Sequence, residues 1–486
     1  MSERITAVWF RTDLRVHDHA PLLEAARDGA VRCVYCLDPG DTDASAQIGI
    51  DRRGPWRSRF LGEALRSLRG ALRELGGELV LLRGKPEVVL PERAREEGWS
   101  ALYFHEGVGT EEREVEAAVR AALGDGVQAR SWWDRTLVDP RELPFGIEET
   151  PEVFTRFRKI VEKGGGYPAP LEAPDRIRGA AVEDPGELPG SEELGWAGLE
   201  DDERAVLRFR GGESAGLLRL EEYLWTTDSL RTYKETRNGM VGADYSSKLS
   251  PWLALGCLSP RRIQAEVERY EAERVANDST YWLTFELLWR DYFQLIAAKH
   301  GPALFRPSGL QGIRRPWNRD ERGFAAWCEG RTGIPLVDAN MRELRASGFM
   351  SNRGRQIVAS FLTKNLGIDW RWGAEWFEAQ LVDYDVASNW GNWCYSAGVG
   401  NDARGFRYFD IATQAKKYDR RGRHARLWCP ELESLPDRHV HAPWELDRSE
   451  QERFSFNLGR DWPRPLVDLE ASVASNRRRW EAAGSY

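Results

Sequence analysis

The apolar residues of this chain change their pattern once, and that change limits which folds are open to it. In the first 134 residues, short strand-like apolar runs alternate with helical stretches. The runs are TAVWF, RCVYCL, ELVLLRG, ALYFHEG and ARSWWD. A long helical stretch, FLGEALRSLRGALRELGG, lies between the second and third runs and ends at Gly76 and Gly77, as helices often end at glycine. Such alternation predicts an α/β domain with a parallel sheet and helices on its faces.

The rest of the chain is predicted to be helical. After about Asp139 comes a stretch rich in Pro, Gly and Glu, typical of a linker. From about Gly211 helical periodicity takes over, and apolar residues at 282, 285, 289, 292, 293 and 296 form one stripe, ended by Lys299, His300 and Gly301. A chain of 486 residues has room for two domains. We predict an α/β domain over 1–139, a linker over 140–210, a helical domain over 211–436 and a C-terminal extension over 437–486, whose role the sequence does not reveal.

Composition excludes several classes of protein. The chain is 41% hydrophobic and 30% charged, and no apolar run approaches the roughly 20 residues of a membrane-spanning helix. The N-terminus MSERITAVWF lacks the order of features of a secretory signal, so we expect a cytoplasmic protein. The net charge of -8 argues against coating nucleic acid with the whole surface, but it leaves room for a local basic groove.

The six cysteines are expected to be reduced thiols, because a chain of this size needs no disulfide framework. Cys33 and Cys36 lie three apart in a strand-like run, so they should point to opposite faces of the sheet. No other cysteine or histidine pair has the spacing of metal ligands, and we predict no metal site.

Four polar clusters mark the helical part. The turn Tyr245–Pro251 packs hydroxyls and a lysine before an expected helix start, with Ser250 as cap, and such a terminus can bind phosphate. A capped helix would explain this turn equally well if it stood alone. Three more clusters follow at Gly348–Gln356, Asp383–Asp385 and Asn389–Trp393. Because buried polar groups need partners, these clusters together predict an internal ligand site.

Longer strings in the helical part resemble the flavin domain of photolyases and cryptochromes, in the family's order. They are SSKLSPWLALGCLSP, FELLWRDYF, TGIPLVDANMRELRASGFMSNRGRQIVASFL and LVDYDVASNWGNWCYSAGVGNDARGFRYF. Near the N-terminus, Phe10–Arg15 resembles the family's opening signature, and the resemblance reaches about Pro436. It implies a Rossmann-like α/β domain followed by a larger all-α FAD-binding domain.

Carried over residue by residue, the resemblance implies a set of FAD contacts. They fall on Tyr233, Ser246, Ser247, Lys248, Leu249, Ser250, Arg290, Asn352, Arg355, Asp383, Asp385 and Asn389. In the family the FAD is folded into a U. The hydroxyl-rich turn would then hold the pyrophosphate, Arg355 would pair with Asp383 near the flavin, and Asp385 would meet the ring edge.

Asn389 would face flavin N5. The family's plant photoreceptors carry an aspartate at this position, which can donate a proton, whereas an amide can interact with either protonation state. Asparagine therefore favours an enzyme that cycles a fully reduced flavin.

The resemblance also implies an electron-transfer role for three of the 21 tryptophans. Trp393 would lie nearest the flavin, Trp370 next and Trp317 at the surface. Packing explains most of the others, since tryptophan buries a large apolar area.

The resemblance implies five contacts to the damaged DNA, at Glu286, Trp289, Arg353, Gln356 and Tyr395. Glu286 would bond the bases of a pyrimidine dimer flipped into the pocket, and Trp289 would stack on them. Glu286 borders the apolar stripe, so we expect it to be partly buried with a raised pKa; an ordinary helical ion pair with Arg290, four residues on, is the alternative. Arg353, together with Lys416 and Lys417, would face the DNA backbone.

Gln356 and Tyr395 stand where photolyases acting on duplexes carry methionine and a second tryptophan. Both changes resemble the DASH group, whose members are associated with single-stranded or looped DNA. A smaller aromatic would hold a flipped dimer too weakly to offset duplex opening, which costs a few kcal/mol.

The resemblance thus implies blue-light repair of cyclobutane pyrimidine dimers in single-stranded DNA by electron transfer from reduced FAD. We expect a monomer with DNA as partner. An antenna, 5,10-methenyltetrahydrofolate, is implied at Glu111 and Glu112, which occupy the acidic segment after the fourth strand, although two adjacent glutamates also suit an ordinary helix start.

Three alternatives stay open. A blue-light photoreceptor would use flavin photoreduction without catalysis; Asn389, Glu286 and Trp289 favour repair over it. A dark flavin oxidoreductase lacks a nicotinamide fingerprint, since Gly107-Val-Gly109 has no third glycine. Repair of six-four photoproducts would need a histidine pair that the pocket motifs do not show.

Overall fold

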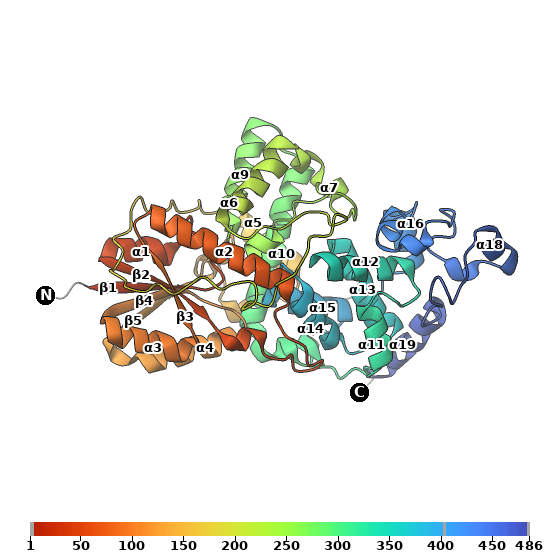
Figure 1. The fold of residues 1–486 in the computed structure, drawn as a ribbon, viewed down its shortest axis with the longest axis horizontal. Helices are drawn as coiled ribbons and strands as arrows, with labels where there is room; N and C mark the ends of the chain where they lie inside the picture. The colour runs from red at the N-terminus through yellow and green to blue at the C-terminus, as the bar shows by residue number, and fades with distance from the viewer. Residues whose placement is uncertain (1–3, 402–404, 484–486) are drawn as a thin grey trace.

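The computed structural model describes residues 4–401 and 405–483, so Asp402, Ala403 and Arg404 of the last motif lie outside the described residues. Its N-terminal part is a five-stranded parallel sheet in the order β3-β2-β1-β4-β5 (Figure 1). The strands are β1 (Ile5–Phe10), β2 (Ala30–Leu37), β3 (Leu79–Arg83), β4 (Trp99–His105) and β5 (Gln128–Trp132). The helices between them are α1 (Ala20–Asp28), α2 (Pro55–Glu74), α3 (Pro86–Glu97) and α4 (Thr110–Leu123). This is the predicted Rossmann-like domain.

The two faces of the sheet bury different helices. Residues of α1 and α2 pack on the face that carries Cys33, whereas residues of α3 and α4 pack on the face that carries Cys36. The prediction that these cysteines point to opposite faces is therefore confirmed, and all six cysteines are buried and free. The strand order reverses between β1 and β4, and in open α/β sheets the crevice at such a point is where ligands bind.

The predicted linker lies against the sheet domain and contains one α-helix, α5 (Phe154–Lys163), preceded by two short 3-10 turns. Beyond α5 it has little regular structure, yet the Ala180 amide donates to the Val31 carbonyl at 2.9 Å and the Leu81 amide donates to the Pro185 carbonyl at 2.9 Å. These bonds hold the proline-rich segment beside β2 and β3.

From Glu213 onward the described residues form helices, as predicted. They are α6 (Glu213–Glu221), α7 (Tyr233–Thr236), α8 (Ser250–Ala254), α9 (Pro260–Glu273), α10 (Asp278–His300), α11 (Glu321–Cys328), α12 (Pro335–Ser347), α13 (Asn352–Ser360), α14 (Trp370–Gln380), α15 (Val386–Ala397), α16 (Ile411–Tyr418), α17 (Arg423–Trp428), α18 (Arg448–Arg453) and α19 (Leu469–Ala483). Helix α10 is capped by Asn277, and its end at Gly301 is the one that the sequence pattern predicts. It lies at the centre of the molecule, between the sheet domain and α14 and α15 (Figure 1).

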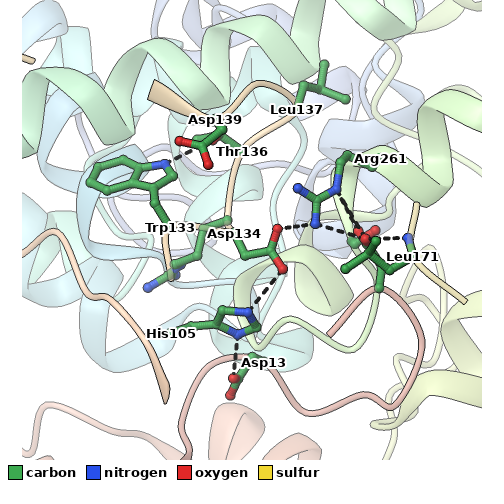
Figure 2. A network of polar contacts seen from close by, with 12 residues as sticks. Asp13, His105, Trp133, Asp134, Thr136, Leu137, Asp139, Leu171 and Arg261 are labelled. Carbon is green, nitrogen blue, oxygen red and sulfur yellow. Dashed lines mark hydrogen bonds and ion pairs between the residues drawn. The ribbon is translucent and has the colours of Figure 1, made fainter. Parts of the chain in front are cut away.

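A buried network of charges, which we call the interdomain network, joins the two domains (Figure 2). It consists of Asp13, Asp18, His105, Asp134 and Arg261. His105, at the end of β4, faces carboxylates with both ring nitrogens: Nδ1 lies 2.7 Å from Asp13 and Nε2 lies 3.1 Å from Asp134. Arg261 of α9 pairs with Asp134 and, at 2.8 Å, with Asp18. Each charge is thus paired, as burial requires.

Candidate functional site

The helical domain contains a cavity of about 460 Å³, within the size range of cofactor sites. Its walls come from α7, the segment Ser246–Ser250, α10, α13, α14 and α15. All twelve residues predicted to contact FAD line it: Tyr233, Ser246, Ser247, Lys248, Leu249, Ser250, Arg290, Asn352, Arg355, Asp383, Asp385 and Asn389. The clusters that are far apart in sequence therefore share one internal space.

Lys248 gives this cavity a buried cation. Its backbone takes a positive φ of 54°, and its ammonium donates to the Ala243 carbonyl at 2.6 Å over the ring of Tyr245. Burial lowers the pKa of Lys248 to about 7, and among the described residues no carboxylate forms an ion pair with it. The carboxylates of Asp244 and Glu343 act on Lys248 only from a distance, so a phosphate would supply a direct counter-charge, and the segment Ser246–Ser250 fits the pyrophosphate of FAD.

The expected cap at Ser250 is wrong. Helix α8 begins at Ser250, the capping position falls on Leu249, and no side chain caps the helix. Instead the Ser250 hydroxyl donates to Asp383 at 2.6 Å. Since α8 has only five residues, its terminus contributes little to anion binding, and the hydroxyl serves to orient a carboxylate.

The predicted pairing of Arg355 with Asp383 is present, at 2.8 Å. Asp385 caps α15 through the Ser388 amide at 2.8 Å and accepts further bonds from Gln294 at 3.0 Å and Arg135 at 3.1 Å. Burial alone would raise the pKa of Asp385, but the neighbouring guanidinium groups outweigh it and lower the pKa. Asp385 is therefore a fixed negative charge in the cavity wall.

Arg135 and Gln294 were not predicted from the sequence. Arg135 follows β5 and reaches Asp385 from the sheet domain, and its carbonyl accepts a bond from Arg290. Neither residue lies in a polar cluster, and their partner is 250 and 91 positions away, so no local pattern could have found them.

The predicted lesion contacts Glu286, Trp289, Gln356 and Tyr395 line the same cavity. The predicted partial burial and raised pKa of Glu286 are confirmed, because burial raises that pKa against the effect of Arg237. Glu286 pairs with Arg237 at 2.5 Å, so the alternative pairing with Arg290 is not the one formed. The rings of Trp289 and Tyr395 meet edge to face at 6.1 Å.

Arg353 lies outside the residues that line the cavity. Its guanidinium packs 4.6 Å over the ring of Tyr418, and Lys417 approaches the same ring at 5.3 Å. Lys416 and Lys417 are exposed on α16. The three predicted backbone contacts therefore form one basic area beside the cavity.

The three predicted tryptophans run from the cavity to the surface. Trp393 lines the cavity, and its ring packs so tightly against Gly373 that a Cβ there would lie 2.2 Å away. Gly373 is one turn from Trp370 on α14, which is fully buried. Trp370 and the half-buried Trp317 donate to one acceptor, the Pro307 carbonyl, at 3.3 and 3.0 Å. Trp370 and Trp317 thus share an acceptor, and Trp393 packs against α14 one turn from Trp370.

Glu111 and Glu112 lie at the start of α4, and they differ. Glu111 is exposed and pairs at 2.7 Å with Arg52, which also holds Glu378 of α14 at 2.9 Å. Burial raises the pKa of Glu112, whose side chain folds over Gly107 and Gly109. The two glutamates therefore lie where the sheet domain meets α14.

Asp13, His19 and His105 have ligand-type atoms within 4.8 Å of one another, a grouping that the sequence spacing did not reveal. Asp13 already lies 2.9 Å from His19 Nε2 and 2.7 Å from His105 Nδ1, and His19 Nδ1 accepts the Leu22 amide. These groups satisfy one another without a metal.

Among residues 4–401 and 405–483, no helix is long and apolar enough to cross a membrane.

Comparison with known proteins agrees with this geometry. The family described as DNA photolyase matches residues 6–175, and the family described as FAD binding domain of DNA photolyase matches residues 282–482. The second match continues past Pro436 and takes in most of the C-terminal segment. Fold and cavity together define a photolyase-type flavoprotein.

Individual relatives are similar over nearly their whole length. A protein from Gloeobacter violaceus named cryptochrome DASH is 55% identical, covering 100% of this chain and 97% of its own. The crystal structure of a Synechocystis cryptochrome has a TM-score of 0.95 at 50% identity, covering 98% of this chain and 99% of its own. A class III photolyase from Agrobacterium tumefaciens has a TM-score of 0.85 at 30% identity, covering 100% and 99%. This chain belongs to the photolyase/cryptochrome family and groups with its cryptochrome DASH members.

Proposed function

We propose that this protein repairs cyclobutane pyrimidine dimers in single-stranded or looped DNA under blue light. One observation carries the proposal: the residues suited to hold FAD and those suited to hold a flipped dimer line the same cavity. Bound reduced FAD, once excited, would supply the electron that splits the dimer and then recover it. We further propose the division into a sheet domain (1–139), linker (140–210), helical domain (211–436) and C-terminal segment (437–486).

The chain's own residues bind, orient and exclude water. Lys248 and the hydroxyls beside it would hold the pyrophosphate, and the Arg355–Asp383 pair and Asp385 would fix the ring. Asn389, whose amide donates to the Ala374 carbonyl at 3.0 Å, presents its oxygen without an acid proton. A proton held on Glu286 would bond a base carbonyl of the dimer, consistent with the raised pKa of that group.

Preference for single strands follows from Gln356 and Tyr395. A flipped dimer would contact the ring of Trp289 and the smaller ring of Tyr395, which meet edge to face. Less stacking leaves less free energy to offset the unpairing of a duplex. The basic area of Arg353, Lys416 and Lys417 would contact the backbone of either form.

The decisive experiment is blue-light repair by the reduced, FAD-loaded protein of one thymine-dimer oligonucleotide, single-stranded and in duplex. We expect repair of the single strand only. Equal repair of both would make this a general dimer photolyase. Repair of neither, with flavin bound and reduced, would overturn the proposal.

A second candidate function is blue-light sensing. Trp317, the surface member of the proposed tryptophan chain, meets Trp480 of the C-terminal helix α19 at 5.9 Å. Oxidation of Trp317 would therefore change the charge beside α19. Limited proteolysis in light and dark tests this: faster cleavage within α19 in light, abolished in Trp317→Phe, would favour signalling.

We also propose that Glu111 and Glu112 hold a folate antenna. The protein is further proposed to be a monomer. Burial raises the pKa of Glu112, so its carboxyl group can keep a proton and hydrogen-bond the edge of a pterin as donor or as acceptor. Titration of the FAD-loaded protein with 5,10-methenyltetrahydrofolate should give bound absorbance in the wild type and much less in Glu112→Ala, and light scattering should give one chain per particle.

A further inference from the structure

The end of the tryptophan chain lies in an arginine-rich surface. The segments 314–322 and 477–481 carry seven arginines and three carboxylates, in a chain whose net charge is -8. Arg479 donates to the Pro316 carbonyl at 2.6 Å, and Arg315 donates to the Trp480 carbonyl at 3.0 Å. These bonds bring both segments together around Trp317. We call this surface the arginine rim.

The positive charge of the rim is not cancelled locally. Arg314, Arg319 and Arg478 are exposed, and among the described residues none of them pairs with a carboxylate. Burial lowers the pKa of Arg315, and no neighbouring carboxylate counters that effect. The rim therefore has a positive potential, which raises the local concentration of anions.

The cations around Trp480 would also keep the tryptophan radical cation at Trp317. The next ring, Trp480, is buried, with the guanidinium of Arg315 at 3.8 Å and the ammonium of Lys364 at 4.2 Å from its centre. Two cations over one ring disfavour a positive charge on it. A radical cation formed at Trp317 would thus stay on this half-buried ring, where solutes can reach it.

We propose that the arginine rim collects a small anionic reductant that gives one electron to oxidised Trp317. This inference rests on the proposed tryptophan chain. In the step the indole radical cation gains one electron and becomes neutral Trp317, while the reductant loses one electron and releases its proton to water.

A small anion fits the rim better than an acidic protein does. Among the described residues, the exposed large hydrophobic side chains are Val88, Val153, Leu171, Leu218, Val241 and Leu466. None of them lies in segments 314–322 or 477–481, whereas a protein interface needs an apolar centre.

The first test needs no flavin. Fluorescence quenching by iodide, an anion, and by acrylamide, which is neutral, is compared in wild type and Trp317→Phe, and the difference isolates Trp317. In a variant with Arg314, Arg319 and Arg478 all changed to Gln, we expect iodide quenching of Trp317 to fall at least about twofold and acrylamide quenching to stay unchanged. The matched control changes Arg66, Arg95 and Arg156 to Gln; these are exposed on α2, α3 and α5, away from α19 (Figure 1).

The second test follows a light flash on the FAD-loaded protein. The yield of oxidised tryptophan tests the proposed chain, and its bimolecular reduction by ascorbate or by neutral hydroquinone tests the rim. We expect the ascorbate rate alone to fall several-fold in the rim variant and with added salt. Equal ascorbate rates in wild type, rim variant and control, or unchanged iodide quenching, would overturn the proposal. Absence of a tryptophan signal would instead contradict the chain itself and leave iodide quenching to decide the rim.

Discussion

The interdomain network and the cavity are both buried and polar, but they differ in how their charges are satisfied. In the interdomain network, protein groups face every charge, down to both nitrogens of His105. In the cavity, and among the described residues, the Lys248 ammonium bonds only a carbonyl and lies over a ring, with Asp244 and Glu343 acting on it without an ion pair, and the buried side-chain oxygen of Gln356 has no partner. Within the described part of the chain Arg290 donates only to backbone carbonyls, although the charge of Asp385 acts on it.

This difference separates structure from binding. Buried polar groups cost free energy unless they are bonded, so a fully paired network stabilises the fold as it is. A group left without its counter-charge indicates a ligand that completes it. On this criterion the interdomain network holds the domains together, and the cavity is suited to bind an anionic cofactor.

The largest effect is expected from breaking the network. Arg261→Met removes the guanidinium that pairs with both Asp18 and Asp134, and loss of one partner in a buried pair costs about 3–5 kcal/mol. The free energy of unfolding in urea should fall by that amount. Arg448→Met, at an arginine that is 94% exposed, should change it by less than about 0.5 kcal/mol. Equal losses in both variants would erase the distinction between the two regions.

Asp383→Asn should act on binding. The carboxylate orients Arg355 and Ser250 in the cavity wall, so its loss should weaken FAD about 30- to 100-fold, or about 2–3 kcal/mol, measured by flavin fluorescence titration. Asp369→Asn is the matched control, since Asp369 is also buried and pairs with Arg371 at 2.7 Å but does not line the cavity. A similar loss of affinity in both would show that the cavity pair is not special.

The pH dependence of FAD binding should reveal Lys248. Its pKa is lowered to about 7 by burial, and a bound phosphate would raise it again. Above about pH 7 the empty protein must take up a proton to bind, so affinity should fall as pH rises, by at most about tenfold per pH unit. Lys248→Met should bind more weakly and with a flatter pH profile. Lys234→Met, at a half-exposed lysine outside the cavity, should keep the wild-type profile.

The sequence predicted what repeats locally or belongs to long motifs. Alternating apolar runs predicted the sheet and the opposite faces of Cys33 and Cys36, because strand geometry has a period of two. The motifs predicted which residues line the cavity. What they would bind there stays a prediction until it is measured.

Apart from the Arg355–Asp383 pair, which the resemblance implied, pairing between distant segments was not predicted. The partners of Ser250 and Asp134 lie 133 and 127 positions away, so spacing carried no signal for either bond. Ser250 at a helix start predicted a cap, but tertiary contact with Asp383 took its hydroxyl instead. The same holds for Glu286, which pairs with Arg237 from another element rather than with the arginine one turn along its own helix.

The smallest effect concerns the protonation of His105. Burial alone would lower its pKa, but the carboxylates of Asp13 and Asp134 outweigh it and raise the pKa above the ordinary value. A raised pKa gives stability that is fully present below about pH 6.5 and lost as pH rises through the folded-state pKa. The difference in free energy of unfolding between wild type and His105→Gln should therefore be larger at pH 6 than at pH 9. His300→Gln removes a histidine that pairs with Glu152 near the surface, and it should cost less at either pH. The same difference at both pH values would mean that the interdomain network does not rely on a charged imidazole. Asp13 and Asp134 would then lack that counter-charge, and the contrast with the cavity would be weaker.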